Sequence, residues 1–245
     1  MNIPISTYIG VALQAVFGLG LPAALYLFLR KKYNCKAKPF WIGCGVMLIF
    51  ALELEQAAHS VILATPFGQR LAANPIYLAV YGGFMAALFE EGGRFIAFRY
   101  ILKDDDPHSA LMYGAGHGGF EAFAVMFLAA LSNFACIAAV RAGETDTMLY
   151  ASVNALISTP FYMYPMALLE RCAALCAQIG LSVTMYFGVK KKRGWIALAA
   201  LMHFALDAIS VSLQTVLPVW VLELLICGMA AVIALTARKI WRKSA

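Results

Sequence analysis

Long apolar stretches alternate with short polar segments along the whole chain, and their lengths suit a lipid bilayer. A helix that crosses the hydrocarbon core needs about 20 consecutive, mostly apolar residues. Seven stretches come close to or exceed this length, at residues 5–29, 40–64, 77–102, 110–140, 166–189, 195–214 and 219–237. The pattern predicts a bundle of about seven transmembrane helices, because only helices or closed barrels satisfy backbone polar groups in lipid.

A shorter segment, residues 148–159, is moderately apolar and is interrupted by polar residues. Pro160 and Pro165 separate it from the next long stretch. We expect this segment to form either an interfacial helix or a re-entrant piece. No soluble domain and no repeat is evident elsewhere, so residues 1–245 are predicted to form a single integral-membrane helical domain.

Composition places the chain in the class of integral membrane proteins. Hydrophobic residues make up 62% of the 245 positions and charged residues 13%, whereas a soluble domain carries about 25% charged residues. The mean hydropathy of +0.77 agrees with this class. The fold is therefore predicted to be all-α, a polytopic helical bundle in the plasma membrane of a bacterium or archaeon.

Basic residues predict how the bundle is oriented. The net charge of +6 does not point to a nucleic-acid partner, because lysines and arginines gather beside apolar stretches, at residues 30–32, 190–193 and 238–243. Seven spans place these clusters on one side, and basic loops remain on the cytoplasmic side of a membrane. We expect an external N-terminus and a cytoplasmic C-terminus.

The third apolar stretch contains charges that folding alone does not explain, in the sequence Glu90-Glu91-Gly92-Gly93-Arg94. A charged side chain at bilayer depth costs about 3 kcal/mol or more on insertion scales, so such residues are usually paired, inward-facing and functional. Arg94 lies four residues from Glu90 and three from Glu91, within reach along a helix. We expect it to pair with one glutamate and to leave the other free for chemistry.

Two later stretches carry polar pairs at a similar depth. His117 and Glu121 are four residues apart, as are His203 and Asp207, so each pair shares a helix face. Counted from the predicted cytoplasmic ends at about 1.5 Å per residue, these residues and Glu91 lie roughly 12–20 Å deep. Three helices are therefore predicted to bring their polar groups into one layer near the middle of the membrane.

Glycines are frequent in the two stretches that carry Glu91 and His117. Small residues allow the backbones of membrane helices to approach closely. We therefore expect the glycines to bring the glutamate and histidine motifs together; they are Gly82, Gly83, Gly92, Gly93, Gly114, Gly116, Gly118 and Gly119.

Other polar residues receive structural interpretations. In the second stretch, Glu55 and His59 are four residues apart and are expected either to pair structurally or to line a water path to the polar layer. Glu170 and Arg171 are expected to form a local pair near the outer interface. The second stretch also contains Glu53 and Gln56.

Three short motifs resemble those of the YhfC-type and PrsW-type intramembrane proteases: Glu90-Glu91-x-x-Arg94, His117-x-x-x-Glu121 and His203-x-x-x-Asp207. They are more distantly similar to those of the CAAX prenyl protease superfamily, which also includes the multi-span scaffold subunit of gamma-secretase. The resemblance covers the third to the sixth apolar stretch. Each motif alone is weak, but three in this order at matched depth form a stronger signal.

The resemblance implies a catalytic centre in which Glu90 or Glu91 is the general base that activates water. The CAAX enzymes typically place the arginine one residue later, so the role implied for Arg94 is an orienting one. Tyr113, four residues before His117, stands where that superfamily often has phenylalanine.

The resemblance also implies that His117 and His203 bind a metal or steady the attacked oxygen, with Glu121 and Asp207 supporting them. Histidines and carboxylates can form a tetrahedral zinc site with an open water position. The same residues can also act without metal, through a glutamate that deprotonates water and histidines that stabilise an oxyanion. The HExxH signature is absent. The resemblance favours zinc, and both alternatives stay open.

The leading hypothesis is an intramembrane endopeptidase, with a catalytic core at about residues 77–215, that cuts a membrane-embedded or membrane-proximal peptide. A second hypothesis is a non-catalytic membrane scaffold of the same fold. A third is a proton-coupled transporter, since buried acids and histidines also form proton relays. The absence of inverted-repeat halves weakens the third hypothesis. The sequence names neither the substrate nor the oligomeric state.

Overall fold

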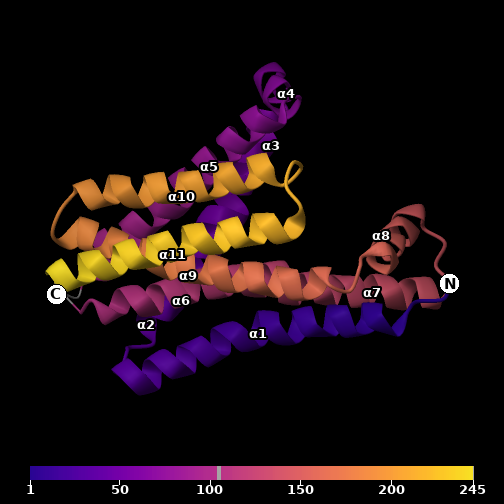
Figure 1. Cartoon of the computed structure of the whole chain (residues 1–245), viewed down its shortest axis with the longest axis horizontal. Helices are drawn as coiled ribbons and strands as arrows, with labels where there is room; N and C mark the ends of the chain where they lie inside the picture. Colours follow the sequence, from indigo (N-terminus) through magenta and orange to yellow (C-terminus); the bar gives the residue numbers. More distant parts are fainter. Residues whose placement is uncertain (104–105, 245) are drawn as a thin grey trace.

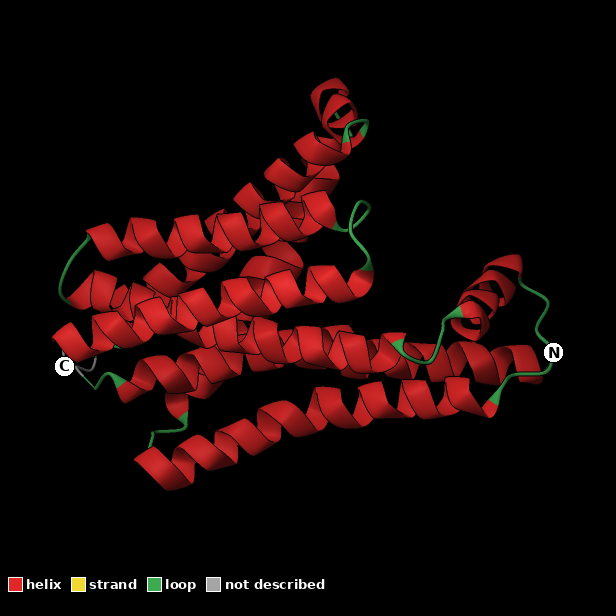
Figure 2. Ribbon diagram, in the orientation of Figure 1, coloured by secondary structure: helices red, strands yellow, loops and turns green. Residues whose placement is uncertain are grey.

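The computed structural model describes residues 1–103 and 106–244, which form helices and connecting loops without a strand (Figures 1 and 2). In chain order the helices are α1 (Ile5–Tyr33), α2 (Lys38–Val46), α3 (Gln56–Leu63), α4 (Pro66–Ala72), α5 (Pro75–Ile96), α6 (His108–Ala122), α7 (Ala129–Arg141), α8 (Thr147–Ser158), α9 (Met163–Lys190), α10 (Gly194–Leu213) and α11 (Val219–Ser244). Three π-helical segments continue α2, α5 and α6: η1 (Met47–Glu55), η2 (Ala97–Ile101) and η3 (Phe123–Leu128). The predicted all-α class is confirmed.

In the described part of the chain, six helical segments are long and apolar enough to cross a membrane: Ile5–Tyr33, Lys38–Leu63, His108–Arg141, Met163–Lys190, Gly194–Leu213 and Val219–Ser244. Helix α4 and the helix Pro75–Ile101 pass the same test together and are bent by 112° at their junction. If this bent pair counts as one span, the number rises to seven. The predicted membrane bundle is thus confirmed. The predicted number of about seven spans equals the upper of the two values that the structure allows.

The bend between α4 and α5 differs from the sequence-based expectation of a short loop at residues 66–75. Thr65 caps α4 by accepting a hydrogen bond from the Gly68 amide at 3.0 Å. Asn74 caps α5 by accepting from the amides of Ile76 and Tyr77. A capped helix can form within a predicted loop because side-chain oxygens satisfy amides that lack an intrahelical partner.

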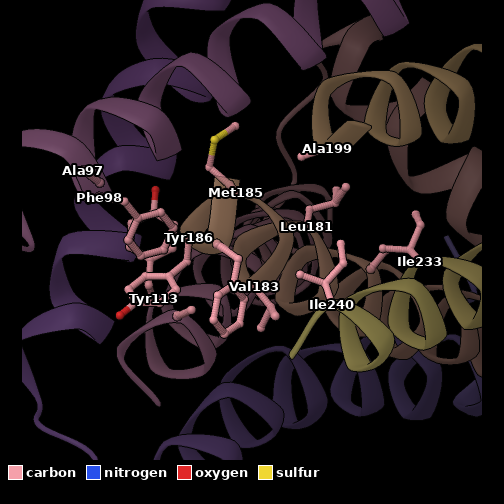
Figure 3. Packing of buried hydrophobic residues seen from close by; sticks show 14 of the residues in the cluster. Ala97, Phe98, Tyr113, Leu181, Val183, Met185, Tyr186, Ala199, Ile233 and Ile240 are labelled. Atoms are coloured by element: carbon pink, nitrogen blue, oxygen red, sulfur yellow. The ribbon is translucent and has the colours of Figure 1, made fainter. Parts of the chain in front are cut away.

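Helix α9 is the centre of the bundle. In the most apolar 18-residue stretch of α9, 72% of the residues are buried, whereas in the corresponding stretches of the other candidate spans 17–22% are buried. It packs against α6, α10 and α11 and also contacts α1 and α5. Figure 3 shows Leu181 and Tyr186 of α9 between Tyr113 of α6 and Ile233 of α11. Polar side chains that point toward α9 are therefore shielded from lipid.

Helices α2 and α6 touch through glycines. A Cβ atom at Gly43 would lie 2.3 Å from the Tyr113 carbonyl oxygen, and one at Gly116 would lie 2.0 Å from that of Phe40. Such backbone contact tolerates no larger residue without a shift. Of the glycines singled out in the sequence, Gly82 and Gly92 face open space, and close neighbours surround Gly83, Gly93, Gly114, Gly116, Gly118 and Gly119.

The segment left open between an interfacial helix and a re-entrant piece forms α8. Its 12 residues are too few to span the hydrocarbon core, which needs about 20. Asp146 caps it, accepting hydrogen bonds from the amides of Met148 and Leu149. The fully buried Val153 belongs to an apolar cluster with Ile137 and Val140 of α7, so α8 lies against the end of α7 (Figure 1).

Candidate active site

Helix α5 supplies two buried carboxylates and a fully buried guanidinium. The exposed fractions are 7% for Glu90, 3% for Glu91 and 0% for Arg94. The Nη1 atom of Arg94 contacts Glu91, and its Nη2 atom lies 3.4 Å from Glu90 Oε2. Arg94 therefore pairs with both glutamates, unlike the expectation that it would leave one of them free.

Helix α6 directs His117 at the first of these glutamates. The imidazole is fully buried, and its Nε2 atom lies 2.8 Å from Glu90 Oε2. The ring of Tyr113, one turn earlier, stacks on it with centroids 5.8 Å apart. The other ring nitrogen, Nδ1, is buried without a hydrogen-bond partner in the described chain. A neutral imidazole that donates from Nε2 to Glu90 fits these surroundings.

Helix α10 brings a second imidazole, that of His203, to both glutamates of α5. The Nδ1 atom of His203 lies 2.8 Å from Glu91 Oε1. Its Nε2 atom lies 3.8 Å from Glu90 Oε2 and 3.4 Å from Asp207 Oδ2. Each ring nitrogen thus faces carboxylate oxygen, and an imidazolium that donates from both nitrogens matches this arrangement. The ring nitrogens of His117 and His203 converge on a single oxygen of Glu90.

Helix α9 contributes Gln178, which sequence reasoning missed. Its Oε1 atom accepts from Arg94, and its Nε2 atom donates to Glu90 Oε2 and to Glu121 Oε2, each at 3.0 Å. A carboxamide has two N–H groups, so it can serve both carboxylates. The signal that the sequence offers is a glutamine within the apolar stretch 166–189. In the structure its side chain is only 6% exposed.

Glu121 belongs to a neighbouring ion-pair group rather than to a histidine pair. Arg171 Nη1 lies 2.7 Å from Glu121 Oε1, and Arg171 Nη2 also contacts Glu170. The local pair expected between Glu170 and Arg171 is present, but Arg171 reaches across to α6 as well. Gln178 joins this group to the carboxylate of Glu90.

The residues expected to bind a metal do not fit one in this arrangement. Both oxygens of Glu121 are engaged by Arg171 and Gln178, away from His117. Within residues 1–103 and 106–244, no group of three or more His, Cys, Asp or Glu side chains is placed to hold a metal ion. The buried guanidinium of Arg94 also adds positive charge where a cation would bind.

A cavity of about 410 Å³ runs beside this cluster between α5, α9, α10 and α11. The polar groups along its wall include His203, Asp207 and Gln178, together with Glu121 and Arg171. A second cavity, of about 610 Å³ and mainly apolar, reaches Glu91 between α5 and α10. The cluster thus lies between a polar cavity and an apolar one.

The second span approaches the same region through Glu55, which is 7% exposed. Its Oε1 atom lies 3.2 Å from His59 Nε2, and His59 Nδ1 lies 2.9 Å from the Tyr81 hydroxyl. The segment η1, which ends at Glu55, packs against α5 and α6. The expected pairing of Glu55 with His59 is present, and its role as a water path stays a prediction.

A buried cluster of acids, imidazoles and one guanidinium inside a helical membrane bundle is compatible with an intramembrane hydrolytic site. The sequence profile of a family described as "YhfC intramembrane metalloprotease" matches residues 17–226, and the chain belongs to this family. The chain is also 30% identical over 207 residues, 80% of each chain, to the "Uncharacterized membrane protein YhfC" of Bacillus subtilis (strain 168). No solved structure matches the chain.

Family membership confirms the resemblance drawn from the three motifs and supports the general kind of function, intramembrane proteolysis. The family description also implies a metal, for which the side chains of this chain offer no assembled ligand set in the part described. The individual catalytic roles of the residues are proposals.

Proposed function

We propose that the protein hydrolyses a peptide bond in or near the membrane, with Glu90 as the general base. The observation that carries this proposal is the convergence of His117 Nε2 and His203 Nε2 on one oxygen of Glu90, among buried side chains. A carboxylate can take a proton from water, and two imidazoles beside it can donate hydrogen bonds to the oxyanion that forms, so the cluster holds both the base and the oxyanion donors.

Glu90 is a better candidate for the base than Glu91. Glu91 already contacts Arg94 and accepts from His203 Nδ1, so its charge is committed to holding these two groups. Its role resembles that of a carboxylate that orients a catalytic imidazole. Glu90 also accepts from Arg94 and Gln178, but it is the glutamate that the Nε2 atoms of both histidines face, whereas Glu91 meets one imidazole. The choice of Glu90 rests on this convergence.

The residues of this chain can account for every proton and bond in the reaction. Glu90 accepts a proton from a water molecule while the water oxygen forms a bond to the carbonyl carbon of the peptide. The carbonyl oxygen becomes an oxyanion that accepts hydrogen bonds from His203 and His117. The C–N bond then breaks, the proton on Glu90 passes to the departing nitrogen, and a carboxyl and an amine are released. One oxyanion donor of this kind contributes about 2.7–4 kcal/mol.

Arg94 and Gln178 hold the base in position. Arg94 bridges Glu90 and Glu91, and Gln178 contacts Arg94 while donating to Glu90. Glu90 Oε2 and Glu91 Oε1 thus each accept from several donors, as low-dielectric surroundings require. Glu91 Oε2 is buried without a partner in the described part of the chain. No step of the scheme needs a metal, and a zinc site built on Glu121 would require Glu121 to leave Arg171.

The test uses purified protein in liposomes with a panel of membrane-spanning model peptides, read by mass spectrometry of the fragments. We expect Glu90→Gln, His117→Ala and His203→Ala each to lower cleavage by about 10²-fold or more. Glu53→Gln serves as the control, because Glu53 is an exposed acid of the second span. Cleavage at the wild-type rate by all three site variants would rule out the proposal. A wild-type protein that cleaves no peptide but retains a stable protein partner would instead indicate a non-catalytic membrane scaffold.

Elemental analysis of the same preparations separates the two chemistries. We expect zinc below one equivalent in the wild type, and the same content in a His117→Ala/His203→Ala double variant. Stoichiometric zinc in the wild type that is lost in the double variant would replace the glutamate scheme with metal catalysis.

A further inference from the structure

The polar cavity beside Glu90 carries an excess of negative charge. Four acids and one arginine lie along its wall: Glu121, Glu170, Asp207, Glu223 and Arg171. Arg171 is already engaged, because it pairs with both Glu121 and Glu170. Asp207 faces His203. Of these four acids, Glu223 is the one for which no ion pair is formed within the described part of the chain.

Glu223 is the observation that points to a missing ligand. It lies in the first turns of α11 and is only 5% exposed. Its Oε2 atom is buried and has no hydrogen-bond partner in the part of the chain that the structure describes. Leaving a buried acceptor unsatisfied costs about 1–3 kcal/mol, and more for a charged group. A donor brought by a bound molecule would remove this cost.

The walls of the cavity suit a long side chain with a charged end. Leu181, Leu206 and Leu222 line it together with the polar groups. Lysine and arginine place an aliphatic stem against such a surface and direct the charged head at carboxylates. The volume of about 410 Å³ leaves room for this side chain beside the peptide backbone.

The cavity also orders its polar groups along its length. Gln214 follows the end of α10 and Glu223 lies near the start of α11. These are the right-hand ends of the two helices in Figure 1. His203 and Gln178 lie at mid-helix, beside Glu90. A peptide whose bond is cut at Glu90 would therefore direct a neighbouring side chain toward Glu223.

We propose that this cavity is a subsite for a lysine or arginine side chain of the peptide substrate, and that Glu223 determines this preference. The proposal rests on the proposed peptide hydrolysis at Glu90 and adds the chemical class of the substrate. Glu223 acts by binding and not by chemistry, so its substitution changes affinity more than turnover.

The test measures binding and cleavage separately. N-acetylated membrane-spanning peptides that carry arginine, leucine or glutamate at the same position are titrated into Glu90→Gln protein, which binds without cutting. We expect the arginine peptide to bind about 10-fold or more tightly than the leucine peptide, the amount that one charge-assisted hydrogen bond supplies. Acetylation removes the α-amino group, so any preference comes from the side chain.

The variant Glu223→Gln, made in the same Glu90→Gln background, keeps the shape of the side chain and should abolish the preference. Glu223→Lys should reverse it in favour of the glutamate peptide. Glu144→Gln, an exposed acid in the loop before α8, should leave it unchanged. Circular dichroism and size-exclusion profiles establish that each variant is folded.

Equal binding of the arginine and leucine peptides to folded protein would overturn this subsite, as would a preference that survives Glu223→Gln. Cleavage of the same peptides by protein with native Glu90 tests the proposed hydrolysis independently. A peptide that binds with the expected preference but is never cut would count against the hydrolysis and not against the subsite.

Discussion

Arg94 is the residue on which the electrostatics of the buried cluster depend. It is fully buried, contacts Glu91 and Gln178, and lies 3.4 Å from Glu90. A guanidinium offers several donors in a fixed plane, so one side chain can match two carboxylates and an amide oxygen. Lysine, with a compact ammonium, could not hold the same three partners in this geometry.

Removal of the Arg94 charge should therefore destabilise the protein strongly. Arg94→Gln leaves two buried carboxylates without their cation, and breaking a buried ion pair in this way costs about 3–5 kcal/mol. We expect a clearly lower melting temperature in detergent and no peptide cleavage. Thermal unfolding followed by circular dichroism checks the first expectation.

Arg99→Gln provides a matched control for this prediction. Arg99 lies on η2, which continues the same helix, and its side chain is exposed. Its substitution should leave the melting temperature within a degree or two, because exposed charges contribute little. Equal destabilisation by the two substitutions would mean that Arg94 does not neutralise the cluster.

Much of the cluster is predictable from residue spacing. Depth counting placed Glu91, His117 and His203 in one layer, and the structure brings both histidines within 4 Å of the Glu90-Glu91 pair. The partners of Glu121 could not be found this way, because Arg171 and Gln178 reach it from α9. Spacing along one helix says nothing about which face of a second helix meets it.

At the scale of elements, the contact between α2 and α6 includes the backbone of His117. A Cβ atom at Gly43 of α2 would lie 2.3 Å from the Tyr113 carbonyl oxygen and 2.8 Å from the His117 amide nitrogen. This close approach brings the backbone that carries His117 into direct contact with the second span. A residue larger than glycine must push the two helices apart.

Gly43→Ala should consequently destabilise the bundle by about 1–3 kcal/mol, the usual cost of overpacking. Gly45→Ala, on the same helix, should be neutral or slightly stabilising, because nothing lies within 4 Å of its Cβ position and alanine favours helix by about 0.5–1 kcal/mol. Melting temperatures of the two variants in one detergent give the comparison. A larger loss at Gly45 than at Gly43 would contradict the packing shown between α2 and α6.

The apolar stretches predicted most helices, while the finer irregularities of the helices were not predictable. Helix α4 lies where a loop was expected, and its caps involve Thr65 and Asn74, residues equally common in turns. The π-helical segment η1 shifts the hydrogen-bond register before Glu55. A π-helical segment of this kind leaves the hydrophobic pattern almost unchanged, yet it changes which face the following residues occupy.

At the scale of the whole molecule, the three basic clusters lie at one end of the bundle. The end of α1, the loop between α9 and α10, and the end of α11 are together at the left of Figure 1. The loops before α8 and between α10 and α11 lie toward the opposite end. This agrees with the sequence-based sidedness, in which basic residues mark the cytoplasmic face.

The orientation itself is open to a direct measurement. In a background without the six native cysteines, single cysteines are introduced by Glu144→Cys, in the loop before α8, and by Lys191→Cys, in the loop after α9. A membrane-impermeant maleimide should label the Glu144→Cys variant in intact cells. It should label the Lys191→Cys variant only after detergent permeabilisation, which makes both cysteines accessible. The end of the polar cavity nearest Glu223 then faces the outside, and the lysine or arginine of the substrate enters from that side. Labelling of Lys191→Cys in intact cells would invert the orientation and place that entrance in the cytoplasm, where basic segments of membrane proteins are most abundant.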